Sequence, residues 1–267
     1  MAQSVTSPAA LPDTQPDIQA DTLSVAKLVA RPRDGHVEVG VAYHRLTADL
    51  GTLRQLFVRG ALRTDEKNVW QGEVVGQRQF GDQGSFYGLS NTHVFTPNVY
   101  VITAAGTSSG GFFLPRFRAG LTVGRKWLPH SLVTTAGVGY LEWKDAHRDA
   151  QLLLGVLYYF RVPLVLESGV TWNRSMPGSV ISRYQYLAAT QGRDRERFIT
   201  ARIETGHEAY QLISEGSPIA DFRSSGVSLG IRQWVRRRWG LAGKMELYAN
   251  PSYQRRGVTL GGFIQLE

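Results

Sequence analysis

The sequence contains no cysteine among its 267 residues. This absence excludes a disulfide framework and any zinc or redox site that is built on thiolates. The sequence also lacks a long hydrophobic run, because the longest one, Leu152 to Phe160, has only nine residues. A transmembrane helix needs roughly 18. Charged residues make up 19%, below the ~25% of an ordinary soluble domain. These absences exclude a disulfide-rich scaffold and a membrane-spanning helix within these residues.

Lysine is scarce as well, since only five of the 30 basic residues are lysines and the net charge of +8 comes from arginine. A basic chain can bind nucleic acid. Here, however, the arginines fall on turns and on alternating positions of predicted strands, so we expect no nucleic-acid partner. The run Arg236–Arg238 lies in a predicted turn, where it contacts either phosphate headgroups or only water.

Residues 1–35 differ in composition from the rest of the chain. Positions 2–22 are rich in alanine, proline, glutamine, serine and aspartate and show no apolar period, which predicts a flexible tail. This tail is a candidate plug for the domain that follows. That domain would comprise residues 36–267.

From His36 onward the dominant hydrophobic period is two, which predicts β-strands. In the segment Pro163 to Asn173, one face would carry Leu164, Leu166, Ser168, Val170 and Trp172. Turn-forming residues interrupt such runs at regular intervals. We count 14 candidate strands, starting near residues 36, 53, 68, 84, 98, 115, 131, 149, 162, 179, 195, 221, 239 and 252. Twelve strands result if two weaker runs, such as 36–46 and 195–206, merge or fail. The chain is predicted to be all-β.

Three features favour a membrane barrel over a soluble sandwich. Many strands keep one apolar face over ten or more residues, the opposite face is polar, glycine-rich and charged, and aromatic residues gather near strand ends. Those aromatics are Trp70, Phe80, Phe86, Phe95, Tyr100, Phe117, Trp127, Trp143, Phe160, Trp172, Trp234 and Trp239. We therefore predict a single antiparallel up-and-down transmembrane β-barrel in the bacterial outer membrane.

An even number of strands, with the N-terminus in the periplasm, places every second connection on the periplasmic side. All connections in that set are predicted to be short. The opposite set contains the longest predicted loop, His207 to Asp221, and the segment Gly110 to Phe113. We expect the 207–221 loop to act as a lid or outer gate.

Charged residues on the predicted inner face form a candidate interior network. They line either a polar conduit or binding surface for a hydrophilic or anionic solute, or a barrel closed by internal salt bridges. The candidates are Arg59, Glu73, Arg116, Arg118, Lys126, Glu167, Arg183, Arg202, Glu204, Arg232, Lys244 and Glu246.

Catalysis in such a barrel would need a nucleophile or carboxylates beside a positioned base. The best histidine candidates are His93 with Asn91 on one strand face, and His207–Glu208 with Asp221. Neither matches a catalytic pattern, and no metal-ligand spacing or phosphate-binding loop is present. We expect no enzymatic activity, no cofactor and no metal.

Three short motifs resemble the YaiO family of outer-membrane barrels. Trp70-x-Gly72 followed by Arg78-x-Phe80-Gly81 is similar to the family's opening strands. The stretch from Phe112 to Gly120 resembles its Phe-x-Pro-x-aromatic-Arg segment, and Gly137-Val138-Gly139-Tyr140 its next strand. The likeness implies a role in the export or surface display of a polysaccharide.

Together these observations predict a non-enzymatic outer-membrane barrel that serves as a conduit or binding surface for an exopolysaccharide. The alternatives are a closed barrel that scaffolds the envelope and an enzyme that modifies lipid or lipopolysaccharide. The expected partners are outer-membrane lipid and lipopolysaccharide, a polysaccharide and a periplasmic secretion partner.

Overall fold

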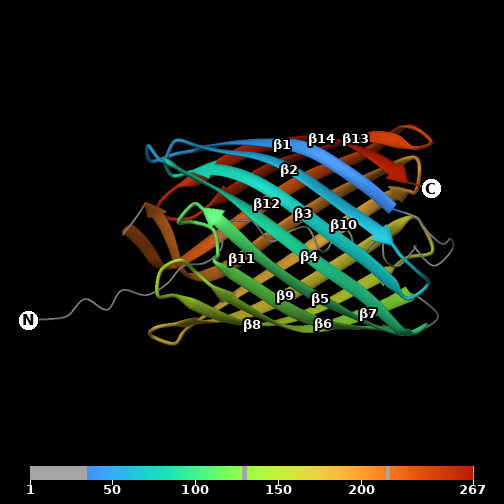
Figure 1. The fold of residues 1–267 in the computed structure, drawn as a ribbon, viewed down its shortest axis with the longest axis horizontal. Coiled ribbons are helices and arrows are strands. Elements are labelled where there is room, and N and C mark those ends of the chain that lie inside the picture. The colour runs from blue at the N-terminus through green and yellow to red at the C-terminus, as the bar shows by residue number, and fades with distance from the viewer. Residues whose placement is uncertain (1–34, 128–130, 215–216, 267) are drawn as a thin grey trace, which may run out of the picture.

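The computed structural model describes residues 35–127, 131–214 and 217–266, which form one closed β-barrel (Figure 1). Each strand pairs antiparallel with the next, and β14 pairs with β1. The strands are β1 (Gly35–Leu46), β2 (Thr52–Arg63), β3 (Asn68–Gln79), β4 (Asp82–Thr96), β5 (Val99–Gly110), β6 (Phe117–Trp127), β7 (Leu132–Glu142), β8 (Arg148–Tyr159), β9 (Leu164–Met176), β10 (Val180–Arg193), β11 (Arg197–Ser214), β12 (Ser217–Arg236), β13 (Trp239–Ala249) and β14 (Gln254–Leu266). The predicted fold of 14 strands is confirmed.

Within the described ranges, no helix has the length and apolar character required to cross a membrane. Of the tail predicted for residues 1–35, positions 1–34 lie outside the described residues, whereas Gly35 already belongs to β1.

The barrel has two ends, which we name by the strand ends they contain. β1 begins and β14 ends at the proximal end, marked C in Figure 1, and the opposite end is the distal end. Proximal connections have two to four residues and distal ones two to six. The difference in connection length is therefore smaller than the sequence predicts.

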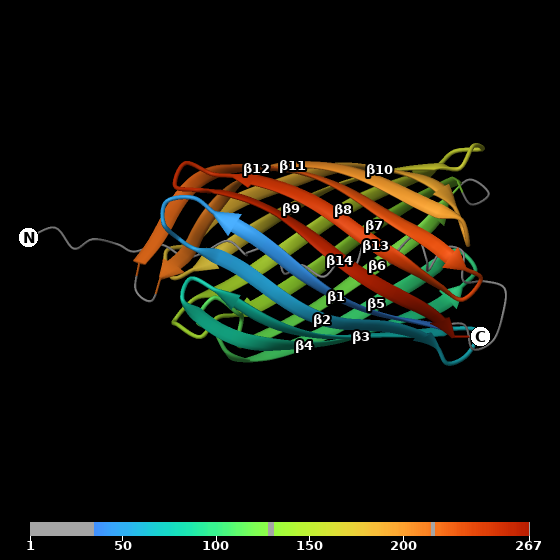
Figure 2. The same cartoon turned by 90° about the horizontal axis from the view of Figure 1, so that it is seen from above.

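The predicted long loop at residues 207–221 is instead a β-hairpin, and this prediction is wrong. β11 and β12 have 18 and 20 residues and stay paired as far as Ser214 and Ser217, so they extend beyond their neighbours at the distal end (Figure 2). The run from Tyr210 to Pro218 contains few charges and a single glycine, so the ladder can continue where turn chemistry was expected.

The two wall faces differ as a membrane barrel requires. Large apolar side chains point outward on most strands and are exposed, for example Val41 at 53%, Leu89 at 55% and Leu260 at 61%. In water, each such group would cost about 25 cal/mol per Å² of apolar area. Closure of the sheet pairs every strand edge, so no unpaired backbone of the wall meets the lipid.

Only some of the predicted girdle aromatics lie on the outer surface. Trp70, Phe95, Phe117, Trp127, Phe160 and Trp239 are exposed there. Phe86, Tyr100, Trp143 and Trp234 are instead buried. Since an aromatic residue near a strand end suits either face, position along the strand does not decide its direction.

Candidate functional site

The inner wall is the candidate site, because most of the predicted network residues lie on it. They alternate with the exposed apolar residues of the outer wall. The network residues on the inner face are Arg59, Glu73, Arg118, Lys126, Glu167, Arg202, Glu204, Arg232, Lys244 and Glu246.

Two residues of the predicted network lie elsewhere and are corrected. Arg116 precedes β6 in the β5–β6 loop, is largely exposed and pairs with Glu142 at 3.5 Å. Arg183 shares the outer face of β10 with Ile181 and Leu187, which are 68% and 47% exposed. In β10, tyrosines alternate with arginine and glutamine, so hydrophobicity alone does not show which of these residues face outward.

Four of the inner arginines lie in a repeated arrangement. An aromatic ring lies against a glycine of a neighbouring strand, an arginine guanidinium lies over that ring, and a carboxylate pairs with the arginine. The four stacks, in that order, are Gly40–Phe57–Arg59–Glu73, Gly106–Phe86–Arg118–Glu73, Gly169–Tyr186–Arg202–Glu204 and Gly240–Phe263–Arg232–Glu38.

The glycines are required because no side chain fits between the ring and the wall. A methyl group on Gly106 would lie 2.4 Å from Cζ of Phe86, and one on Gly40 would lie 2.4 Å from Cζ of Phe57. Absence of a side chain therefore lets each ring lie close against the wall.

The distances within the stacks fit cation–π contact. The guanidinium carbon lies 4.6 Å from the ring centre in the Arg59 stack, 4.8 Å for Arg118, 3.9 Å for Arg202 and 3.8 Å for Arg232. Such contacts are attractive by about 0.5–2 kcal/mol, more when water is excluded. They fix the orientation of a long side chain that would otherwise move.

Carboxylates hold the other edge of these arginines, from the same strand for Arg202, from the adjacent strand for Arg59, and across two intervening strands for Arg118 and Arg232. Glu73 lies 3.4 Å from Arg118 and 3.6 Å from Arg59, so one carboxylate serves two stacks. Arg232 donates to Glu38 at 2.6 Å. The exposed fraction of these side chains ranges from 11% to 34%, so solvent space reaches them. The wall thus presents fixed pairs of opposite charge.

Lining residues between the charged pairs are mostly small. Strands β12 to β14 and β6 contribute glycine, serine, threonine and alanine on their inner faces: Gly120, Thr122, Gly226, Ser228, Ala242, Thr259 and Gly261. Elsewhere Glu167 accepts a 2.7 Å hydrogen bond from Tyr186 Oη, and Lys244 lies 3.5 Å from Glu246.

The distal end is narrowed by the β5–β6 loop, which folds into the barrel. Gly110 and Gly111 have φ values of 58° and 62°. Glycine adopts such positive φ values readily, and here they turn the chain inward. Phe113 and Leu114 are then 2% and 1% exposed and pack against inward-facing side chains of β2 to β4. Phe112 donates its backbone N–H to Asp82 at 2.8 Å.

Further rings continue this apolar layer across the distal end. Phe80 stacks on Phe112 with ring centres 6.4 Å apart, and Tyr253 meets Phe80 edge-on at 6.4 Å. Leu50 and Ile213 pack in the same region. Because Ile213 belongs to β11, the layer joins strands from opposite parts of the wall.

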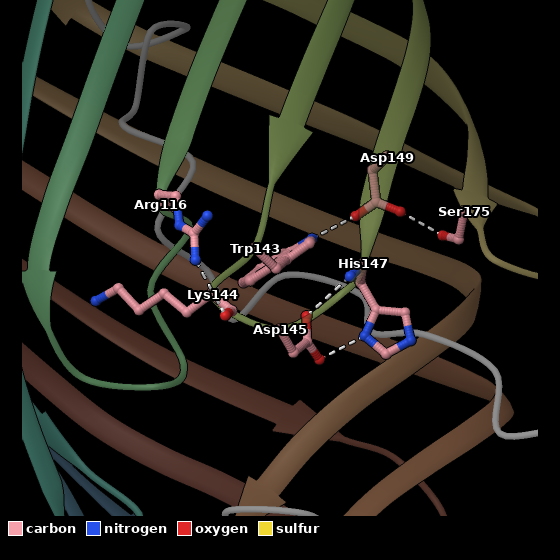
Figure 3. A network of polar contacts seen from close by, with 7 residues as sticks. All are labelled: Arg116, Trp143, Lys144, Asp145, His147, Asp149 and Ser175. Carbon is pink, nitrogen blue, oxygen red and sulfur yellow. Dashed lines mark hydrogen bonds and ion pairs between the residues drawn. The ribbon is translucent and has the colours of Figure 1, made fainter.

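A polar network at the distal β7–β8 connection contains side chains of the kinds used in catalysis (Figure 3). Asp149, 2% exposed, accepts hydrogen bonds from Trp143 Nε1 at 2.8 Å and from Ser175 Oγ. His147 instead contacts Asp145. In this network the serine hydroxyl binds a carboxylate and not an imidazole, so it does not form a nucleophile–base pair. The hydrogen bond ties β9 to β8 near their distal ends.

Lys144 of the same connection holds the β5–β6 loop. Its Nζ donates to the backbone oxygens of Gly110 and Gly111, the latter at 3.0 Å. Partial burial lowers the pKa of Lys144 below its usual value, and the nearby carboxylate of Asp82 opposes that shift.

The histidine candidates are only partly brought together. His207 lies 3.2 Å from Asp221 on the outer face, whereas Glu208 points inward and accepts a 2.9 Å hydrogen bond from Tyr248 Oη. The His93 ring contacts Asn68 at 2.9 Å, rather than the predicted Asn91.

Several inner charges are missing from the predicted interior network, including Glu38, Arg255 and Glu208, which was predicted only as a partner of His207. For Glu38 a signal was available. It alternates with Val37 and Val39, which places it on the face opposite the lipid.

Comparison with known families identifies the barrel. The model of the YaiO membrane β-barrel domain matches residues 34–211. The chain belongs to the YaiO family. The resemblance seen in the sequence is thereby confirmed, and the YaiO match includes three of the four stacks in full. Comparison with curated proteins gives no match.

Solved structures share the fold of this YaiO barrel at low identity. The CymD monoaromatic hydrocarbon channel has 8% identity and a TM-score of 0.58, with 92% of each chain covered. A bacterial polysaccharide outer membrane secretin has 8% identity and a TM-score of 0.53, covering 87% of this chain and 98% of that one. Omp33 of Acinetobacter baumannii has 9% identity and a TM-score of 0.51, covering 88% and 100%. The YaiO barrel is therefore a bacterial outer-membrane barrel with a porin-like fold.

Proposed function

We propose that this barrel is a non-enzymatic conduit that binds an extracellular polysaccharide along its inner wall. The observation that carries the proposal is the set of four stacks, in which each arginine is fixed between a ring and a carboxylate. Paired donors and acceptors suit sugar hydroxyls, which both donate and accept hydrogen bonds. Short side chains between the stacks leave room for a chain of sugar rings.

The fold likeness to a protein described as a polysaccharide secretin makes a polysaccharide the first ligand to test. In this proposal the proximal end, where β1 begins and β14 ends, faces the periplasm, and the distal end faces outward. A polysaccharide would then enter between the proximal turns and leave past the apolar layer at the distal end.

Single-channel recording in a planar bilayer tests this function. We expect steady conductance, interrupted when oligosaccharides of dextran or alginate are added. The double variant Arg118→Ala/Arg232→Ala should shorten those interruptions about tenfold, because it removes two charged contacts. Arg54→Ala, on the outer face, is the matched control. Conductance without interruption by either sugar would contradict the proposal.

The apolar layer at the distal end favours a second candidate, a closed barrel with a scaffolding role. If Phe112, Phe113 and Tyr253 shut the distal end permanently, the wild-type barrel is silent in the bilayer. Replacing Phe112, Phe113 and Leu114 with serine separates the two functions. A conduit conducts as the wild type and conducts more in the variant, whereas a barrel closed by the apolar layer is silent as the wild type and conducts only in the variant.

A further inference from the structure

A row of basic side chains lies on the outer wall, where a membrane barrel normally presents apolar residues. Arg183 of β10 stands directly beside His207 of β11, which stands beside Arg223 of β12. Trp172 of β9 is the register partner of Arg183 on its other side, and its ring lies 5.9 Å from the guanidinium. Arg183 and Arg223 are exposed, so the row is accessible from the membrane.

Below this row the outer wall becomes apolar in two steps toward the proximal end. The next row across β9 to β12 is mostly polar without charge, and the one after it is mostly apolar. Those two rows are Val170–Gln185–Thr205–Ser225 and Ser168–Leu187–Ile203–Val227. A change from charged to polar to apolar over about 14 Å of strand is what the boundary between headgroups and acyl chains requires. The row of Arg183, His207 and Arg223 therefore lies at the level of the lipid headgroups.

The apolar part of this wall carries an open groove. A groove of about 1000 Å³ crosses the outer faces of β6 to β11, beginning at Arg183 and reaching Trp127 near the proximal end. It forms because Ala136 and Ser168 are short while Leu154 and Leu187 beside them are long. A groove of this size has room for several acyl chains, which a smooth apolar belt would not hold in fixed positions.

We propose that this surface is a specific site for a phosphorylated lipid with several acyl chains. The phosphates would contact Arg183, Arg223 and His207, and the acyl chains would fill the groove beneath them. Arginine suits this role because its planar fork binds phosphate oxygens in pairs. Among the residues that the structure describes, Asp221, 3.2 Å from His207, is the carboxylate that pairs with this row, and neither arginine forms an ion pair there.

The same barrel supplies a natural control. A second group of outward arginines lies at the distal end of β14 and β1 to β3, where Arg54 and Arg78 are direct neighbours in register. Arg54 also lies over an aromatic ring, that of Tyr43 at 5.7 Å. The groove described above does not extend to these strands. Charge alone would make the two groups equivalent, whereas a lipid site requires charge and groove together.

Native mass spectrometry of the purified barrel in detergent tests the site, with bisphosphorylated hexa-acyl lipid A, its dephosphorylated form and phosphatidylglycerol as probes. We expect one retained lipid A, about tenfold weaker retention in Arg183→Ala/Arg223→Ala, and no change in Arg54→Ala/Arg78→Ala. Ala136→Trp fills the groove from outside and should also weaken retention, although both arginines remain.

Each alternative result would overturn the site. Equal losses from the two arginine pairs would show general attraction to anionic lipid, and equal retention of the dephosphorylated form would remove the role of phosphate. Equal retention of phosphatidylglycerol would contradict a ligand with several acyl chains. Since these side chains face outward, conductance should be unchanged, so this test is independent of the proposed conduit.

Discussion

Arginines on the two faces of this wall show how one residue type takes two roles. Arg118 lies 4.8 Å from the ring of Phe86 and Arg183 lies 5.9 Å from that of Trp172. Arg118, however, also meets Glu73 at 3.4 Å and is 16% exposed, whereas the side-chain acceptor of Arg183 is the neutral Gln185 at 3.0 Å. The inner arginine is fixed by opposite charge, and the outer one keeps its charge available.

This difference predicts that inward substitutions change stability and outward ones change only surface contacts. The largest effect is expected for Phe113→Ala, which removes a 2% exposed ring from the apolar layer at the distal end. The free energy of unfolding should fall by about 3 kcal/mol. Urea unfolding of the refolded barrel in detergent measures the change.

Phe117→Ala is the matched control for that substitution. Phe117 is four residues further along the chain and faces outward with 42% exposure, so the loss should be below about 1 kcal/mol. Equal losses from the two variants would mean that the inward β5–β6 loop contributes no more than a lipid-facing side chain.

Glu73→Gln removes the carboxylate that two inner arginines share. Arg59 and Arg118 would then face each other without the carboxylate that they share, and the loss of a buried counter-charge costs several kcal/mol in a dry interior. Solvent reaches Arg59, 34% exposed, so we expect a loss of about 2 kcal/mol. Chemical denaturation at low and high salt measures it, and salt should reduce the loss.

The outward-side counterpart is Glu142→Gln, which breaks an ion pair with Arg116 whose side chain is 61% exposed. Exposed pairs contribute about 0.5 kcal/mol or less. If both glutamine variants lose the same stability, the inner pair is no more important than a surface one.

The next largest loss of stability is expected for Gly106→Ala, which tests the close packing of the Phe86 ring on Gly106. The new methyl group would lie 2.4 Å from that ring and 3.0 Å from the backbone oxygen of Tyr87, so the ring must tilt inward. Overpacking of this kind costs about 1–2 kcal/mol. At Gly76 the nearest atom would be 3.9 Å away, so Gly76→Ala should be neutral or slightly stabilising. An unchanged free energy of unfolding in Gly106→Ala would contradict this close packing.

The fold could be predicted from the sequence because strand period and turn residues repeat locally. Most strands begin within two residues of their predicted positions, and β12, which begins at Ser217 instead of near 221, differs most. Local patterns do not report where a ladder stops when turn residues are weak. This is why the β11–β12 hairpin was expected to be a loop.

The candidate site was predicted less completely, for a physical reason. Hydrophobicity shows which residues of a strand face outward where the outer side chains are aliphatic, as around Glu38. It fails in β10, where Tyr184 and Tyr186 point inward and Arg183 outward. Contacts such as Arg118 with Glu73 join residues 45 positions apart, and the groove depends on side-chain lengths across six strands. Neither is encoded in any local pattern.

The smallest effect belongs to a charge in full contact with water at the proximal end. Asp65 lies in the β2–β3 turn and accepts hydrogen bonds from the Asn68 side chain at 2.9 and 3.0 Å and from the backbone N–H of Lys67 at 2.8 Å. These bonds favour the carboxylate and lower its pKa below the usual range, with the Asn68 side chain as the largest cause.

Because the folded pKa of Asp65 is depressed, the stabilisation of the turn is present above the unfolded pKa of aspartate and is lost as the pH falls through the folded value. Asn68→Ala should return the pKa of Asp65 toward that of a free aspartate, as measured by carboxyl carbon shifts in NMR titration. Salt should weaken this shift only slightly, since hydrogen bonds cause it and not a distant charge. An unchanged pKa would show that the backbone donors alone hold the carboxylate, and that a side-chain partner matters only where the wall excludes water.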